Sequence, residues 1–141
     1  MNVLLSINPP YAEAIFKGEK KYEFRRAIFK RRGIEKVYLY VNSKVKKILG
    51  SFEVDDIIEG SPQEIWEKCK EYGGISKEDF FKYFEGSNVA YAIKIKNVEQ
   101  FPEPIDPYTQ HIFKNFTPPQ SFYYLRHDLG NSLSLKLTSF M

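Results

Sequence analysis

One stretch near the start of the chain carries the strongest structural signals: Ile7-Asn8-Pro9-Pro10-Tyr11-Ala12-Glu13-Ala14-Ile15-Phe16-Lys17-Gly18-Glu19-Lys20-Lys21-Tyr22-Glu23-Phe24-Arg25-Arg26. The apolar run of residues 3–7 that leads into it predicts a short strand. A helix is predicted next, because Asn8 can cap it, the prolines after Asn8 suit a first turn, and Gly18 lies beyond its end. Apolar and charged residues then alternate over residues 21–25, which predicts a second strand.

Further elements follow along the chain. Alternating apolar residues predict three more strands, over residues 36–42, 47–58 and 89–98. Two helices are predicted between the last two of these strands, one after a capping box at Ser61 and one after Ser76. The prolines at 102, 104 and 107 predict an irregular crossing, and residues 117–120 predict another capped helix start. The tail, residues 132–140, is either a final strand or a flexible end.

These elements define an expected architecture. Five or six short strands with few helices favour the α+β class and a small mixed β-barrel with flanking helices. The length of 141 residues suits one domain over residues 1–141, with 107–141 as a C-terminal extension that packs on the barrel or is partly flexible. The strand, helix and strand at the start leave room for a cleft where the first helix meets the sheet.

Charge is distributed unevenly along the sequence. Residues 17–47 carry twelve Lys or Arg and three Glu, a net charge of +9, whereas the other 110 residues carry nine Lys or Arg and fifteen acidic residues, a net charge of −6. Segregated charge of this kind attracts polyanions to one surface. Five cations fall in one predicted loop: Arg26, Lys30, Arg31, Arg32 and Lys36. This loop either contacts phosphates or is simply solvated.

Composition excludes several classes of protein. No apolar run is long enough to cross a membrane and no secretory signal is visible, so we expect no membrane association. The single cysteine, Cys69, permits no internal disulfide and fits the cytoplasm, which is the expected location. His111 and His127 lie far from Cys69 in sequence, so we expect no metal site. Nothing in the sequence indicates a cofactor.

The tract after Gly18 combines both signs of charge. Lys20 is expected at the turn that ends the helix, and Lys21, Glu23 and Arg25 on one face of the strand that follows. Such a row can bind a phosphate through its cations while Glu23 accepts a hydrogen bond from an amine or hydroxyl group. The alternative is a solvated edge of weak surface ion pairs.

Two more residues are candidates for the site. Tyr40 shares the second face of the predicted strand over residues 36–42 with Tyr38, where it can stack on bases or be buried under a helix. Glu71 lies at the end of a predicted helix, where the helix dipole disfavours a carboxylate. A solvated glutamate is the alternative for Glu71.

The opening stretch resembles the signature of ASCH domains, in which a helix ends in Gly-x-Lys and runs into a strand that bears Glu or Thr and Arg. Val37-Tyr38-Leu39-Tyr40-Val41-Asn42-Ser43 and Ile48-Leu49-Gly50-Ser51-Phe52-Glu53-Val54 resemble the next two strands of that family, so the resemblance covers roughly residues 3–98. It implies a PUA-like β-barrel with a basic cleft beside the first helix. It also implies binding of RNA or a modified nucleotide.

On this resemblance, the binding residues are expected to divide by role. Lys20, Lys21, Arg25 and Arg26 would contact phosphate or carbonyl groups. Glu23 would accept a hydrogen bond from the exocyclic amine of a base, and Tyr40 would be the stacking platform. RNA or a nucleotide is therefore the expected partner.

The resemblance also implies alternatives. One branch of the family hydrolyses acetylcytidine with a Lys, a Thr and a Glu; the Lys falls on Lys20, the Thr on Glu23, which is a departure, and the Glu near Glu71. Other relatives are reported as ribonucleases. On this alternative, the chain is a hydrolase that acts on a modified nucleoside or on RNA. It would resemble an acetylcytidine amidohydrolase or a ribonuclease, with Lys20, Glu23 and Glu71 as catalytic residues. A third hypothesis is a regulatory protein-interaction module whose basic face meets an acidic partner.

Overall fold

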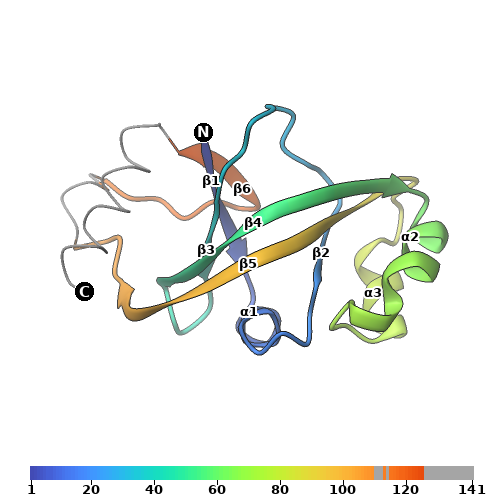
Figure 1. Cartoon of the computed structure of the whole chain (residues 1–141), viewed down its shortest axis with the longest axis horizontal. Helices are drawn as coiled ribbons and strands as arrows, with labels where there is room; N and C mark the ends of the chain where they lie inside the picture. The colour runs from blue at the N-terminus through green and yellow to red at the C-terminus, as the bar shows by residue number, and fades with distance from the viewer. Residues whose placement is uncertain (110–112, 114, 126–141) are drawn as a thin grey trace.

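The computed structural model describes residues 1–109, 113 and 115–125. Within these residues, six strands form one curled sheet, in the order β2-β5-β4-β3-β1-β6 (Figure 1). The strands are β1 (Asn2–Ile7), β2 (Tyr22–Arg25), β3 (Val37–Val41), β4 (Lys47–Gly60), β5 (Ala90–Ile105) and β6 (Phe122–Leu125). The helices are α1 (Pro9–Phe16), α2 (Pro62–Cys69), the 3-10 turn η1 (Lys70–Tyr72) and α3 (Lys77–Tyr83).

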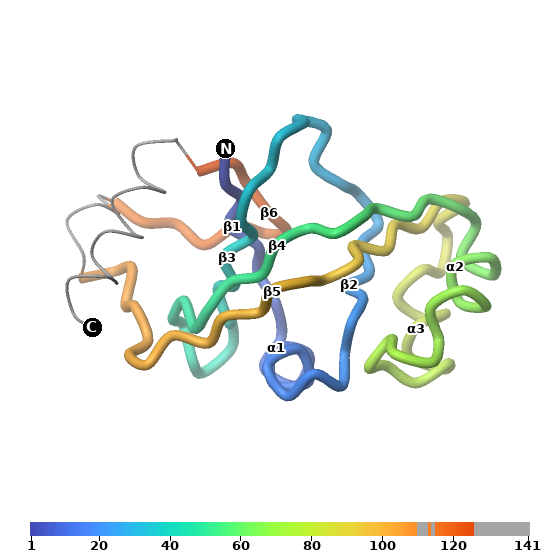
Figure 2. Tube along the Cα trace, viewed as in Figure 1, coloured from blue at the N-terminus to red at the C-terminus, as the bar shows by residue number. Residues whose placement is uncertain are grey.

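The sheet is mixed and bent into half a barrel. β1 and β3 run parallel, and the other pairings are antiparallel. The long strands β4 and β5 run side by side across the molecule and carry α2 and α3 at one end (Figure 2). The predicted α+β class, with a small barrel-like mixed sheet and flanking helices, is confirmed.

Helix α1 forms where the opening stretch predicts it. Asn8 is its N-cap residue and prolines occupy its first turn, but the Asn8 side chain makes no capping hydrogen bond. Ala12 and Ile15 are buried against the sheet, in a cluster that includes Leu5 and Leu39. Helix α1 therefore covers one face of the sheet, and the Asn8 side chain is left for another contact.

Helices α2 and α3 begin at the predicted caps. The Ser61 hydroxyl oxygen accepts a hydrogen bond from the Glu64 backbone at 3.2 Å, and the Glu64 carboxylate accepts one from the Ser61 backbone at 3.1 Å. The Ser76 hydroxyl oxygen accepts one from the Asp79 backbone at 3.1 Å. In the described part of the chain, no helix has the length and apolar character needed to cross a membrane.

Strand β5 continues to Ile105, through Pro102 and Pro104, where an irregular crossing was expected; Pro107 lies in the turn that follows. Only residues 91–94 of β5 pair with β2. The Ile95 backbone N–H donates to the Lys21 carbonyl at 3.0 Å, and beyond it, among the described residues, β5 has a paired neighbour on one side only, where β4 runs. A proline is tolerated beside a free edge because no ladder hydrogen bond is lost there.

The helix expected to start at residues 117–120 does not form. Strand β6 follows instead, and it pairs with the outer edge of β1. Pro118 and Pro119 favour extended backbone in the residues before them, and the Ser6 backbone N–H donates to the Ser121 carbonyl at 2.9 Å. Pairing with the outer edge of β1 therefore stabilises a strand here more than the local sequence stabilises a helix. The predicted alternatives for residues 132–140 lie outside the described residues.

Both faces of the central strands are buried. Val3, Leu5 and their neighbours pack under α1, whereas Leu4, Tyr38 and Tyr40 pack on the other face against aromatic residues of the C-terminal segment. This second cluster explains the aromatic face of β3, which is covered by irregular chain around Phe116 and not by a helix.

Candidate functional site

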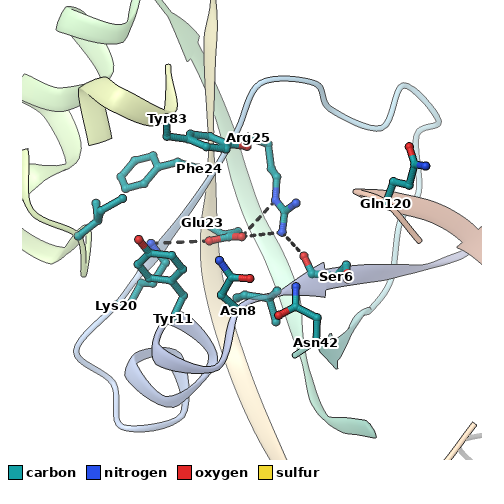
Figure 3. A pocket seen from close by; sticks show the side chains of 12 residues that line it. Ser6, Asn8, Tyr11, Lys20, Glu23, Phe24, Arg25, Asn42, Tyr83 and Gln120 are labelled. Atoms are coloured by element: carbon teal, nitrogen blue, oxygen red, sulfur yellow. Dashed lines mark hydrogen bonds and ion pairs between the residues drawn. The ribbon is translucent and has the colours of Figure 1, made fainter. Parts of the chain in front are cut away.

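A pocket of about 260 Å³ opens between α1, β2 and α3 (Figure 3). Three charged side chains reach into it from the tract after Gly18: Lys20, Glu23 and Arg25. Aromatic side chains form much of the rest of its wall: Tyr11 from α1, Phe24 from β2 and Tyr83 from α3. Four polar residues, Ser6, Asn8, Asn42 and Gln120, and two isoleucines, Ile7 and Ile75, complete the lining.

Arg25 and Glu23 form a buried ion pair on one face of β2, since residues two apart in a strand point the same way. The Nε and Nη2 groups of Arg25 donate to Oε2 of Glu23 at 3.1 and 2.8 Å. Nη2 also donates to the Ser6 carbonyl at 2.6 Å, and Nη1 donates to the Ser121 hydroxyl at 3.4 Å. Arg25 therefore ties β2 to β1 and to the segment before β6.

Lys20 is 2% exposed, in contrast to the solvated turn position that its place in the sequence suggests. Its ammonium donates to the Gly73 carbonyl at 2.5 Å and lies 3.7 Å from Oε1 of Glu23. It also faces the rings of Phe24 and Tyr11, 4.7 and 5.4 Å from their centroids. Burial lowers the pKa of the Lys20 ammonium, and the Glu23 carboxylate partly opposes that shift.

The charged groups keep hydrogen-bonding capacity for a ligand. Oε2 of Glu23 accepts both Arg25 hydrogen bonds, whereas Oε1 has only the 3.7 Å contact with Lys20 among the described residues. The terminal Nη1 of Arg25 carries two N–H groups, and Ser121 accepts one of them. The pocket therefore offers a carboxylate with capacity left on Oε1, beside the Lys20 ammonium.

The tyrosines of the pocket remain protonated well above neutral pH. Burial raises the pKa of Tyr11 and of Tyr83, and the nearby Glu23 carboxylate adds to both shifts. Tyr83 is 39% exposed, so part of its ring is accessible. An accessible aromatic ring beside polar groups is the arrangement on which unpaired bases stack.

The other residues predicted for the site lie outside this pocket. Lys21 is exposed and its ammonium lies 4.4 Å from the Tyr72 ring centroid. Arg26 is exposed and its Nε donates to the Ser87 hydroxyl at 2.9 Å. Glu71 is exposed on η1. Of the charged residues predicted for the site, the structure thus brings together Lys20, Glu23 and Arg25.

Tyr40 is buried on the far side of the sheet from α1. It is 2% exposed, its hydroxyl lies 2.9 Å from that of Tyr108, and its ring packs 5.4 Å from Phe116. Burial and the Tyr108 hydroxyl raise its pKa. Tyr40 does not line the pocket, whose tyrosines are Tyr11 and Tyr83.

Two amide side chains of the pocket were missed, although the sequence carried a signal for them. Asn8 and Asn42 each directly follow a strand, and β1 and β3 are parallel with Ile7 opposite Val41. The ends of parallel strands meet at one edge of the sheet, and the Asn42 backbone N–H donates to the Ile7 carbonyl at 3.0 Å. Figure 3 shows the two amides side by side. Parallel pairing of β1 and β3 would have predicted that the Asn8 and Asn42 side chains lie close together.

The basic loop begins directly after Arg25. Its cations Arg26, Lys30, Arg31 and Arg32 are exposed. Tyr124 of β6 anchors the loop, because its hydroxyl oxygen accepts hydrogen bonds from the backbone of Lys30 at 2.8 Å and of Arg31 at 3.1 Å. The Arg31 guanidinium also lies 4.8 Å from the Tyr124 ring centroid. The loop thus holds several cations at the surface, against β6, and none of them lines the pocket.

Cys69 is a buried free thiol. In the part of the chain that the structure describes, no three His, Cys, Asp or Glu side chains gather in a way that could hold a metal ion.

Comparisons with known proteins agree on the family. Residues 5–103 match the model of the ASCH domain. An ASCH domain-containing ribonuclease of Zymomonas mobilis is 30% identical over 140 residues, which cover 96% of this chain and 91% of the relative. The crystal structure of ASCH from Zymomonas mobilis matches with a TM-score of 0.87 and 28% identity, over 95% of this chain and 94% of that one. The N-terminal domain of Staphylothermus marinus McrB shares the fold, with a TM-score of 0.58 and 12% identity over 96% and 93% of the two chains.

Proposed function

Because this chain belongs to the ASCH family, we propose that it binds single-stranded RNA, or a nucleotide from it, and holds one unpaired base in the pocket between α1, β2 and α3. The observation that carries the proposal is the convergence of Lys20, Glu23 and Arg25 in a pocket walled by tyrosine rings. The similarity to a protein described as a ribonuclease supports RNA as the partner.

The carboxylate of Glu23 favours a base over a phosphate in the pocket. Its Oε1 atom has room to accept a hydrogen bond, and it would repel an anionic oxygen placed there. The volume of about 260 Å³ is below the roughly 300 Å³ at the lower end of sites for drug-sized molecules. The pocket thus suits one base with part of its ribose.

The phosphates of the same strand would then lie on the basic loop. The loop begins directly after Arg25, which lines the pocket, and its cations Arg26, Lys30, Arg31 and Arg32 are exposed. Contacts between cations and phosphates position an RNA without reading its sequence. Binding is therefore expected to weaken as salt increases.

Fluorescence anisotropy with labelled single-stranded RNA at low salt tests this function. We expect Tyr83→Ala to weaken binding about 5- to 150-fold, which corresponds to the loss of about 1–3 kcal/mol of stacking. The matched control is Tyr72→Ala, which removes an exposed tyrosine that does not line the pocket. No binding by the wild-type chain, or equal losses in the two variants, would contradict the proposal.

Hydrolysis of RNA is a second candidate, favoured by the lowered pKa of Lys20. In its neutral form, a lysine can take the proton of a ribose 2′-hydroxyl. The 2′-oxygen then attacks phosphorus and the bond from phosphorus to the 5′-oxygen breaks, which gives a 2′,3′-cyclic phosphate. The 5′-oxygen takes a proton from water, and the hydroxide left behind takes back the proton held by the lysine. Cleavage of labelled RNA that stops with a single 2′-deoxy substitution, and in Lys20→Met, would support this function. Intact RNA after incubation with the wild-type protein would exclude it.

We also propose that the protein works in the cytoplasm. Its single cysteine is a buried free thiol, which suits a reducing compartment.

A further inference from the structure

We infer that the protein binds the end of an RNA strand, an inference that rests on the proposed RNA binding. A second hollow of about 490 Å³ opens between the start of α1 and the start of α3. Asn8, Tyr11 and Ile75 line both this outer hollow and the pocket, so the two share a wall. The outer hollow holds the nucleoside next to the bound base, and this nucleoside is the last one of the strand.

The lining of the outer hollow suits a nucleoside. Two prolines, Tyr11 and Ile75 make up its apolar part, on which a base can pack. Ser43, Ser76 and Asp79 are polar residues that can bind ribose hydroxyls. The Ser76 hydroxyl oxygen accepts from the Asp79 backbone N–H at 3.1 Å, so the hydroxyl proton remains available to donate.

The outer hollow does not stabilise a phosphate. Among the described residues, no lysine or arginine lines it, and its single charged residue is Asp79. In the part of the chain that the structure describes, Asp79 takes part in no salt bridge. Burial raises the pKa of Tyr11 and the Asp79 carboxylate adds to that shift, so the negative charge acts at the wall that the two hollows share.

The helix starts at the outer hollow do not attract an anion either. A helix begins with unpaired backbone N–H groups, which favour negative charge. In α1 the first two positions are Pro9 and Pro10, and proline has no N–H. In α3 the first turn already carries Glu78 and Asp79. A terminal phosphate placed in the outer hollow would therefore meet carboxylates without a compensating donor from α1.

The cationic side of the site lies at the other end of the pocket. Figure 3 shows Tyr11 and Arg25 on opposite sides of the Glu23 carboxylate. Arg25 leads directly into the basic loop, whereas Tyr11 leads to the outer hollow. The phosphate that joins the two bound nucleosides crosses at the shared wall, where the Lys20 ammonium lies 5.4 Å from the Tyr11 ring centroid. A strand with its other phosphates on the loop thus reaches the outer hollow with an end that carries no phosphate.

Four twenty-nucleotide RNAs of one unstructured sequence test the inference by isothermal titration calorimetry, in which no label blocks an end. They are a strand with two hydroxyl ends, the same strand with a 5′-phosphate, the same strand with a 3′-phosphate, and the circular form. The circle and one phosphorylated strand are expected to bind about 5- to 150-fold more weakly than the first strand, the range for the loss of one stacked base.

The phosphorylated strand that loses affinity identifies which end enters the outer hollow. A circular strand that binds as well as the linear one would overturn the inference and leave RNA binding intact. Failure of all four RNAs to bind would overturn the proposed function itself.

The variant Asp79→Asn tests the inference from the protein side. Asp79 is exposed, and the variant keeps the backbone N–H that donates to Ser76, so we expect it to fold. The loss of affinity caused by the terminal phosphate should shrink by about threefold or more when this charge is removed.

Glu78→Gln is the matched control for Asp79→Asn. It removes the same charge from the same turn of α3, but Glu78 does not line the outer hollow. Both variants make the protein more basic, so the ratio of the affinities for hydroxyl and phosphate ends is compared, and Glu78→Gln should keep the wild-type ratio. Equal ratios in the two variants would contradict the placement of the strand end beside Asp79.

Discussion

The Lys20 ammonium donates a hydrogen bond of 2.5 Å to the backbone carbonyl of Gly73, across 53 positions of sequence. This bond joins the start of β2 to the turn between η1 and α3. It also keeps the ammonium beside Glu23. The lysine stem can reach this position only because the next residue, Gly74, has no side chain.

The variant Gly74→Ala is expected to disturb both the turn and Lys20. Gly74 has a φ of +64°, which costs an L-residue about 1–2 kcal/mol. An added Cβ would lie 2.7 Å from Cβ of Lys20, so the lysine must also shift. We expect a loss of stability in urea unfolding together with weaker RNA binding.

Gly86→Ala is the matched control for this change. Gly86 has a φ of +81°, but nothing lies within 4 Å of an added Cβ. Gly86→Ala should lose only the stability that a positive φ costs an L-residue, and it should keep its affinity for RNA. If the two variants lose the same stability and both retain affinity, the contact between Gly74 and Lys20 does not hold the site.

Replacing Arg25 by lysine is expected to destabilise the fold although the charge is kept. A lysine amine cannot bind Glu23 twice and also reach Ser6 and Ser121. The missing hydrogen bonds to charged groups correspond to about 1.5–3 kcal/mol in the free energy of unfolding. Arg26→Lys, on the exposed neighbour, should stay within about 0.5 kcal/mol of wild type. A similar small change in Arg25→Lys would mean that the buried pair contributes little.

The stability of the protein is expected to depend on Lys20 at alkaline pH. Burial lowers the pKa of Lys20 in the folded state, so the unfolded chain binds more protons between the folded value and the ordinary lysine value of about 10.4. The contribution of Lys20 to the free energy of unfolding therefore rises with pH through this window, and below it the full cost of the buried charge remains.

Comparison with Lys20→Met isolates this effect. The variant lacks the titrating group, whereas the tyrosines are common to both proteins. The free energy of unfolding of the wild type, relative to that of Lys20→Met, should increase as the pH is raised from neutral towards 10. A difference that does not change with pH would contradict the lowered pKa.

The basic loop is expected to set the salt dependence of RNA binding. Lys30 and Arg32 are exposed, so replacing both by alanine should leave the fold intact. The slope of log affinity against log salt should become shallower by about 0.7 for each phosphate that the variant no longer neutralises. Replacing the exposed Lys68 and Lys70 by alanine removes the same charge from the surface near α2. Equal slopes for the two double variants would show that the loop does not bind RNA.

Local signals in the sequence were sufficient to predict the elements at the start of the fold. The strand, helix and strand before Arg25 follow from caps and alternation, and so does the placement of Glu23 and Arg25 on one face of β2. The capping residues Ser61 and Ser76 likewise predicted where α2 and α3 begin. These features depend on residues within a few positions of one another.

Features that depend on distant partners could not be predicted in the same way. The burial of Lys20 requires Gly73, and the Gln120 wall of the pocket requires β6 to pair with β1. The burial of Tyr40 requires Phe116 to cover the far face of the sheet. Each of these interactions joins segments that are more than 50 positions apart, so no local pattern specifies it.

Strand β6 lies beyond residue 103, where the match to the family model ends. A chain shortened at that point would still carry the family signature, yet it would leave a row of unpaired N–H and C=O groups along β1, open to edge-to-edge aggregation. It would also lose Ser121, one of the oxygens that hold the Arg25 guanidinium. The described fold therefore needs more chain than the residues that the family model matches, and family members that diverge after β5 are expected to differ along one side of the pocket.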